Sequence, residues 1–268
     1  MPRTPPLTQL GHFKIVRALR PSAHAQRFLA IDEHTNLNIT LHGIDLPDET
    51  SERRRLVAAV ERLAAFRHPH VLDIDTFSLG PDHRLWVSTP FTGNHEGLVL
   101  LSDLTELRGG PLAPAEVSCG IAHLLDAIRH AHSNSLSHGP ITPDEIQCDR
   151  RGSLFIEFYG LERLRDGLQP ANDLLIRDEI RSIVSLAYTL LTGLDSAEPR
   201  IRASRLMKRS DRAWDQWIEA GLDPFAGFAT AKEAIDALPG SPTTDEARPP
   251  VTILSKLGLP SRVPAEAH

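Results

Sequence analysis

The stretch at residues 138–160, H-G-P-I-T-P-D-E-I-Q-C-D-R-R-G-S-L-F-I-E-F-Y-G, decides the fold. It begins as a loop and continues as two apolar runs, 146–148 and 154–158, which D-R-R-G joins at 149–152. A D-x-x-G turn between two such runs predicts a β-hairpin. The residues just before it, A-H-S-N-S-L-S, close a segment with helical periodicity. The sequence therefore predicts a helix, a loop and a hairpin in succession.

This layout resembles the catalytic loop and the metal-binding loop of protein kinases, H-R-D-L-K-P-E-N followed by D-F-G. His138 holds the His of the first motif, whereas Gly139 stands at its Arg and Pro140 at its catalytic Asp. Thr142 replaces the Lys, and Glu145 replaces the metal-binding Asn. The sequence thus matches the spacing of the motif but differs at the residues that carry its chemistry.

The second motif is altered in the same way. Phe158 stands at the metal-binding Asp, Tyr159 at the Phe, and Gly160 matches the Gly. A kinase needs a carboxylate to orient the attacking hydroxyl, and oxygen ligands to hold Mg²⁺ on the phosphates. Proline and phenylalanine provide neither. The resemblance therefore implies a pseudokinase, a kinase-like fold without phosphotransfer chemistry and with no ATP or Mg²⁺ as cofactor.

The glycine-rich loop of kinases has lost its glycines here. Arg20, Ser22 and Ala25 stand at the three positions, where glycine lets the backbone approach a phosphate closely. Arg27 stands at the apolar residue that covers adenine. Its guanidinium can stack on a base, fill the cleft or point to solvent.

Other nucleotide-contacting positions of the kinase pattern are also substituted. The strand at 38–42 places His42 at the phosphate-binding Lys, and histidine is a poor substitute for a fixed ammonium. Ala59 stands at the Glu that pairs with that Lys, and Thr89 is at the gatekeeper position of a hinge at 87–91. Thr40 and Arg27 interrupt the apolar stack that adenine completes. The second apolar stack of the family is expected to survive in the residues Leu63, Ile74, Tyr159 and His138.

The expected fold class is α+β, a two-lobed kinase-like fold with a small antiparallel sheet and one main helix, then a mainly helical lobe. Its expected parts are a flexible N-terminus at 1–9, a small lobe with the hinge at 10–91, a helical lobe at 92–238, and a tail rich in Pro, Ser and Thr at 239–268. Only 18 residues separate Gly160 from Glu179, which predicts a shortened activation segment.

Apolar periodicity predicts the individual elements. We expect a strand at 71–77 and helices at 49–67, 101–107, 114–133 and 180–192. The cap candidates are Thr50 or Ser51 for the first of these helices and Asp211 for a later one. Glu179 is expected to open the buried helix at 180–192, which Gly193 closes.

Composition limits the function classes. Among 268 residues, 41% are hydrophobic and 24% charged, and the net charge of −6 argues against nucleic-acid binding. The first residues lack the apolar region of a signal peptide, and no apolar run is long enough for a membrane helix. Two cysteines, Cys119 and Cys148, are expected as buried thiols in a reducing compartment. We therefore expect a cytoplasmic protein.

Thirteen histidines raise the question of a metal site. The pairs His68/His70 and His130/His132 lack the i, i+4 spacing of a helical site, and no cysteine lies near them. The spacing predicts no metal site.

A basic cluster is the candidate surface for a protein partner, with a solvated basic face as the alternative. Its members are Arg200, Arg202, Arg205, Lys208, Arg209 and Arg212. An acidic protein fits this surface better than nucleic acid, because no aromatic residue is interleaved with the charges. The sequence leaves the oligomeric state open.

Three functions remain. The first is a catalytically inactive interaction, scaffold or regulatory module. The second is a sensor that binds a nucleotide or another small ligand, with Arg27 and His42 as anion contacts. The third is an atypical phosphotransferase that uses Asp144, Glu145 or Glu157 to hold its metal ion.

Overall fold

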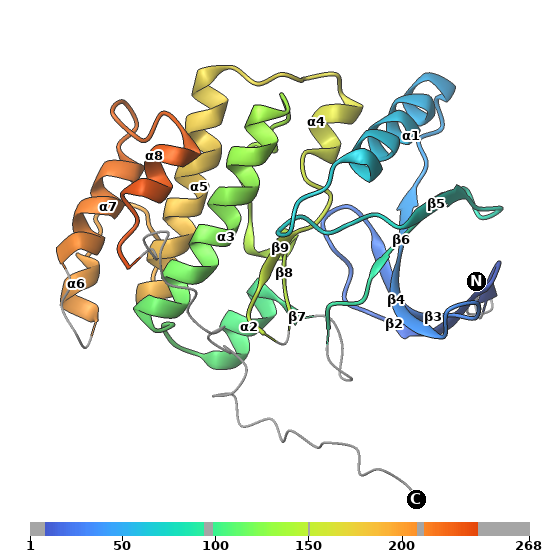
Figure 1. Ribbon diagram of the computed structural model, residues 1–268, viewed down its shortest axis with the longest axis horizontal. Helices are drawn as coiled ribbons and strands as arrows, with labels where there is room; N and C mark the ends of the chain where they lie inside the picture. Colours follow the sequence, from blue (N-terminus) through green and yellow to red (C-terminus); the bar gives the residue numbers. More distant parts are fainter. Residues whose placement is uncertain (1–8, 94–98, 150, 208–211, 241–268) are drawn as a thin grey trace, which may run out of the picture.

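The computed structural model describes residues 9–93, 99–149, 151–207 and 212–240. The chain is an α+β protein: an antiparallel, curled sheet with one helix comes first, and a mostly helical part follows (Figure 1). This arrangement agrees with the two-lobed kinase-like fold expected from the sequence. Within the described ranges, no helix combines the length and the apolar character that a membrane crossing requires.

The first part contains a six-stranded sheet in the order β1-β2-β3-β4-β6-β5. Its strands are β1 (Gln9–Leu10), β2 (Phe13–Ala18), β3 (Gln26–Asp32), β4 (Leu37–Asp45), β5 (Thr76–Leu79) and β6 (Arg84–Pro90). In the register, Arg27 of β3 lies opposite His42 of β4, and Thr40 lies opposite Thr89 of β6. Directly opposed residues share a face of the sheet. The register therefore gathers four of the substituted kinase positions.

Two sequence expectations about this sheet need correction. The strand expected at 71–77 is only a short strand from Thr76, because the preceding backbone pairs with the hairpin instead: Leu72 N donates to Ile156 O at 2.9 Å, and Ile156 N donates to His70 O at 3.0 Å. The expected hinge at 87–91 is still strand as far as Pro90.

One helix, α1 (Thr50–Ala65), covers this sheet (Figure 1). Its buried residues are Leu56, Ala59, Val60 and Leu63, the spacing of one helical face. Glu49 is the N-cap residue and makes no side-chain cap hydrogen bond, so the expectation of a cap at Thr50 or Ser51 was wrong. The helix also ends two residues earlier than the periodicity predicted.

The second part is built around two long helices, α3 and α5, which lie side by side (Figure 1). The helices here are α2 (Leu101–Arg108), α3 (Pro114–Ser133), α4 (Leu161–Arg165), α5 (Asp173–Thr192), α6 (Ala203–Leu206), α7 (Arg212–Leu222) and α8 (Ala231–Asp236). A small sheet of β7 (Val99–Leu100), β8 (Ile146–Cys148) and β9 (Leu154–Ile156) forms beside them, and its β8–β9 hairpin confirms the predicted hairpin. A 3-10 turn, η1 (Pro143–Glu145), leads into that hairpin.

Helix α5 begins well before the predicted start. Asn172 caps it, since its side-chain Oδ1 accepts a hydrogen bond from Leu175 N at 2.9 Å. Glu179 therefore lies inside the helix rather than at its opening, and its side chain is buried. The predicted end at Gly193 is confirmed; this residue has a φ of 73°.

Three clusters of buried side chains stabilise the fold. One fills the helical part, one packs β4, β6 and α1 against Phe158 and Leu161, and a third lies around Trp86. Cys148 is in the first cluster, whereas Cys119 is partly exposed, so the expectation of two core thiols was wrong for Cys119. The cap candidate Asp211 lies outside the described residues.

Candidate functional site

A buried ion pair joins the first sheet to the residue that follows the β8–β9 hairpin. Arg27 comes from β3, and Glu157 follows β9 and precedes the F-Y-G sequence. Arg27 Nη1 lies 3.1 Å from Glu157 Oε2, and neither side chain has measurable solvent exposure. Arg27 Nε also donates to Arg20 O at 2.7 Å. The guanidinium of Arg27 therefore points into the protein, the second of the three orientations considered from the sequence, and not to solvent.

Glu157 is surrounded by donors. Its Oε2 also accepts from Gln147 Nε2 at 2.7 Å, and its Oε1 lies 3.4 Å from His42 Nδ1. Burial alone raises the pKa of Glu157, but His42, Arg27 and Gln147 outweigh it and lower the pKa to about 2. The carboxylate is thus ionised at neutral pH, and Arg27 neutralises its charge inside the protein.

The other cleft positions are packed around this pair. His42 Nε2 lies 2.9 Å from Thr89 Oγ1, and both residues are fully buried. The rings of His42 and Phe158 meet edge-on with centroids 4.8 Å apart. Thr40 is also buried, and its hydroxyl finds no hydrogen-bond partner among the described residues. The Lys, gatekeeper and metal-Asp positions of the kinase pattern thus form one packed cluster with Arg27.

The remaining positions of the degenerate glycine loop take structural roles. Arg20 forms an ion pair with Asp103, Ser22 N donates to Ala25 O at 3.0 Å, and Ala25 is buried. Ala59, at the position of the ion-pairing Glu, lies on the buried face of α1 and belongs to the core cluster there.

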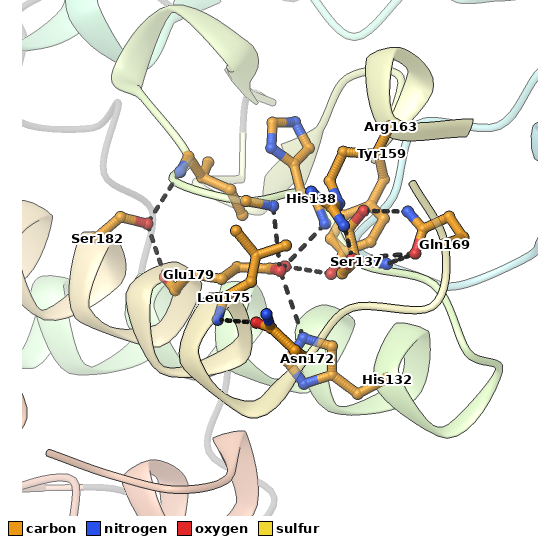
Figure 2. Close-up of polar contacts among 12 residues, drawn as sticks. His132, Ser137, His138, Tyr159, Arg163, Gln169, Asn172, Leu175, Glu179 and Ser182 are labelled. Carbon is orange, nitrogen blue, oxygen red and sulfur yellow. Dashed lines mark hydrogen bonds and ion pairs between the residues drawn. The ribbon is translucent and has the colours of Figure 1, made fainter. Parts of the chain in front are cut away.

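The loop at 138–142 is held from below by Glu179, as Figure 2 shows. Its Oε2 accepts from the backbone amides of His138 at 3.1 Å and Gly139 at 3.2 Å, and lies 3.4 Å from His132 Nε2. The hydroxyl of Tyr159 donates to Oε1. Burial, with the adjacent Glu179 carboxylate, raises the pKa of Tyr159 well above its usual value. This network fixes the loop, while Pro140 and Thr142 remain exposed.

The short segment after Gly160 is tied to the same loop. Gln169 Oε1 accepts from Ser137 N at 3.1 Å and from Ser137 Oγ at 3.0 Å, and its Nε2 donates to Ser137 O at 2.6 Å (Figure 2). Arg163 Nε donates to Ser137 Oγ at 3.0 Å. These hydrogen bonds connect the segment after Gly160 to Ser137, which directly precedes the loop at 138–142.

The apolar stack expected from the sequence is divided between two clusters. Leu63 and Ile74 pack with Phe158, whereas Tyr159 lies in the core of the helical part, with the His138 ring 5.5 Å away. The expectation that Tyr159 belongs with Leu63 and Ile74 was therefore wrong. Phe158 is one residue earlier and large enough to take that place.

A second polar group lies at the mouth of the cleft. Glu145 Oε1 lies 3.4 Å from His24 Nε2 and 3.6 Å from His138 Nε2, and its Oε2 accepts from Thr142 N and Oγ1 at 2.8 and 2.9 Å. Burial raises the pKa of Glu145, but His24, His138 and Thr142 outweigh it and bring it to about 2. Burial lowers the pKa of His138, whereas that of His24 is raised, since Glu145 outweighs its burial.

Sequence reasoning missed the roles of two residues in these polar groups, Glu157 and His24. Glu157 was considered only as a metal ligand, although a carboxylate inside the apolar run L-F-I-E-F is a signal for a buried partner charge. His24 was not singled out at all, because its partners are distant in the sequence. The histidine pairs that were singled out behave differently: His68 pairs with Asp126 at 3.2 Å, and His70 stacks on His123 with centroids 3.9 Å apart.

The candidate partner surface is less basic than the sequence indicated. Arg200 pairs with Glu198 at 2.5 Å, and Arg202 lies 3.5 Å from Glu219. Arg205 and Arg212 are exposed. Lys208 and Arg209 lie outside the described residues. Glu198 and Glu219, which lie outside the basic stretch of the sequence, therefore offset part of its positive charge.

A fold with a curled antiparallel sheet, one covering helix and a helical second part, with a loop and hairpin between them, is consistent with a protein kinase-like protein. No family model matches the chain. It is 24% identical to the serine/threonine-protein kinase PrkC of Bacillus subtilis over 256 residues, which cover 83% of this chain and 38% of PrkC. It is 28% identical to the DNA damage-responsive serine/threonine-protein kinase RqkA of Deinococcus radiodurans over 235 residues, 85% of this chain and 32% of RqkA.

A plant protein, CBL-interacting protein kinase 22 of Oryza sativa, is 26% identical over 176 residues, 59% of this chain and 38% of that protein. The chain thus spans about a third of the length of these relatives. The distant similarity supports a place for this chain in the protein kinase-like superfamily.

Proposed function

We propose that this chain is a catalytically inactive pseudokinase, and that it acts as a protein-interaction, scaffold or regulatory module without binding ATP. The observation that carries the proposal is the buried ion pair between Arg27, at the position expected to cover adenine, and Glu157. A protein partner and a cytoplasmic location are part of the proposal.

Phosphotransfer needs groups that this cleft does not present. Pro140, at the position of the catalytic Asp, has no side-chain proton acceptor, and Phe158 has no oxygen for a metal ion. Glu157 is already bound to Arg27 and Gln147. Asp144 is exposed, and Glu145 faces two histidines. These contacts speak against the atypical phosphotransferase.

Nucleotide binding would have to disrupt the ion pair. Breaking a buried pair leaves an uncompensated charge, which costs about 3–5 kcal/mol. Arg27 and His42, the anion contacts of the sensor hypothesis, both face Glu157. Both side chains are therefore directed at an internal carboxylate rather than at a ligand phosphate, which favours the module over the sensor.

Thermal-shift titration with ATP and ADP tests the proposal. Each nucleotide is added alone, with Mg²⁺ and with Mn²⁺, and the Tm with the metal alone is subtracted. A ligand at about 100 times its Kd stabilises the folded state by about 2.7 kcal/mol, so millimolar nucleotide reveals even weak sites. We expect no nucleotide-dependent shift. A shift that requires Mg²⁺ or Mn²⁺ would support the phosphotransferase, and a shift without metal would support the sensor.

A further inference from the structure

We propose that His24, His138 and Glu145 form a binding site for a divalent transition-metal ion of the Zn²⁺ class. The site lies where the turn between β2 and β3 meets the loop at 138–142 and the 3-10 turn η1. It is separate from nucleotide chemistry and holds whether or not the cleft binds ATP. We refer to these three residues as the His₂Glu cluster.

The distances between the ligand atoms fit a tetrahedral ion. Bonds of about 2.0–2.1 Å from metal to ligand place the ligands of a tetrahedral ion about 3.3–3.5 Å apart. Glu145 Oε1 is 3.4 Å from His24 Nε2 and 3.6 Å from His138 Nε2. The three ligand atoms all lie within 4.8 Å of one another. Two of the three separations are thus near the expected value, and the third is below 4.8 Å.

The cluster is buried, and His24 Nε2, one of its ligand atoms, lacks a hydrogen bond. The side chains of His24, His138 and Glu145 are 8%, 8% and 10% exposed. His24 Nε2 faces Glu145 Oε1, yet it makes no hydrogen bond of good geometry within the described part of the chain. A buried polar atom without a well-formed hydrogen bond is costly and calls for an explanation. A metal ion between the two atoms would supply one.

The neighbours of the cluster orient its ligands. Thr142 N and Oγ1 hold Glu145 Oε2, which leaves Oε1 directed at the histidines. Glu162 Oε1 lies 3.6 Å from His24 Nδ1, the nitrogen on the far side of the ring. A carboxylate behind a metal-binding imidazole fixes the ring and raises its basicity. Thr142 and Glu162 thus orient two of the three ligands, as neighbouring residues do in metal sites.

There is also room for a further ligand. A cavity of about 310 Å³ adjoins the cluster, and His24, Glu162 and Arg165 are among the residues that line it. Of the three ligands, His24 faces this space, which leaves room for a water molecule as the fourth ligand that Zn²⁺ takes when a protein supplies three.

The donor set indicates which ion is bound. Two imidazole nitrogens and one carboxylate suit Zn²⁺ or Co²⁺, whereas Mg²⁺ and Ca²⁺ prefer oxygen ligands. The ion would join a turn of the first part of the fold to the loop and η1 of the second. Its expected effect is to hold the two parts together and stabilise the folded state.

Metal binding to the full chain tests this proposal. The chain is stripped with a chelator, then titrated with Zn²⁺ by calorimetry and with Co²⁺ by visible absorption, which reports tetrahedral coordination. The variants are His24→Gln, Glu145→Gln and Glu162→Gln. The matched control is His34→Gln, which removes the exposed member of a second group, His12, Asp32 and His34.

We expect one Zn²⁺ per chain at the His₂Glu cluster, with a rise in Tm and intense Co²⁺ bands. His24→Gln and Glu145→Gln should abolish these signals, and His34→Gln should leave them unchanged. Glu162 is 63% exposed, so Glu162→Gln should fold normally and weaken Zn²⁺ binding about 10-fold to 100-fold. The proposal is overturned if the wild-type chain binds no Zn²⁺, or if both His24→Gln and Glu162→Gln bind it as the wild type does.

Discussion

At the scale of single residues, the charge of Arg27 is the feature to explain. Burying a guanidinium costs several kcal/mol unless a partner charge and further hydrogen bonds compensate it. Burial lowers the pKa of Arg27, and Glu157 counteracts this effect. Arg20 O and Glu157 Oε2 accept hydrogen bonds from the guanidinium. Removing either residue would therefore leave the charge of the other buried without a counter-charge.

Glu157→Gln is predicted to destabilise the fold by about 3–5 kcal/mol, because it leaves the buried charge of Arg27 unpaired. Adding Arg27→Met to the same chain should recover most of this loss, because the second change removes the orphaned charge and keeps the volume. Denaturant unfolding of the wild type, both single variants and the double variant measures the coupling.

The exposed ion pair Lys232–Asp236 is the control for this cycle. Lys232→Met should cost less than about 1 kcal/mol, because solvent screens an exposed pair. Equal losses at the buried and exposed pairs would contradict the role assigned to Arg27 and Glu157.

At the scale of elements, the loop and segment around Gly160 are packed so closely that a side chain does not fit. Gly160 has a φ of 73°, and a Cβ there would lie 2.6 Å from Ser137 O. Gly193, which ends α5, has the same φ of 73°, but a Cβ there would meet nothing within 4 Å. The two glycines thus have the same backbone conformation and differ in the space available for a side chain.

Gly193→Ala is predicted to cost about 1–2 kcal/mol, the strain of a left-handed alanine. Gly160→Ala should cost roughly 1–3 kcal/mol more, because the backbone carbonyl of Ser137 must also move. Thermal unfolding of the two variants measures the difference directly. If both variants lose the same stability, the close contact at Ser137 is not what requires glycine at position 160.

Sequence periodicity predicted the elements whose apolar residues face one core. Helices α1 and α3 and the β8–β9 hairpin are of this kind. The start of α5 was missed because its first two turns, D-L-L-I-R-D-E, are only partly buried and so lack the signal of a core helix. The strand expected at 71–77 was wrong because the hairpin, and not the sheet, satisfies that backbone.

At the scale of the whole molecule, the site depends on contacts that no local pattern contains. The kinase resemblance located the substituted positions, among them Arg27, His42 and Phe158. The partner of Arg27 could not be predicted, because Glu157 lies 130 positions away in the sequence and only the folded chain brings the two side chains together. The meeting of His24 with His138 and Glu145 has the same origin. Sequence reasoning thus named several residues of the site but not the partners that surround them.

The two parts of the fold share a core at Phe158. Its ring packs with residues of β4, α1 and β6, although Phe158 follows the hairpin of the helical part. Because this cluster spans both parts, we expect the wild type to unfold in one cooperative step. Phe158→Ala should cost about 3–5 kcal/mol and weaken the link between the parts.

Scanning calorimetry measures both effects of Phe158→Ala. The ratio of calorimetric to van't Hoff enthalpy should be near one for the wild type and should rise above one in the variant, as the sheet part melts before the helical part. Phe225, which is 92% exposed, gives the control, because Phe225→Ala removes a ring of the same size without touching a core. A variant Phe158→Ala that loses stability yet still unfolds in one step would show that other contacts, such as those between α1 and α4, couple the parts without the Phe158 ring.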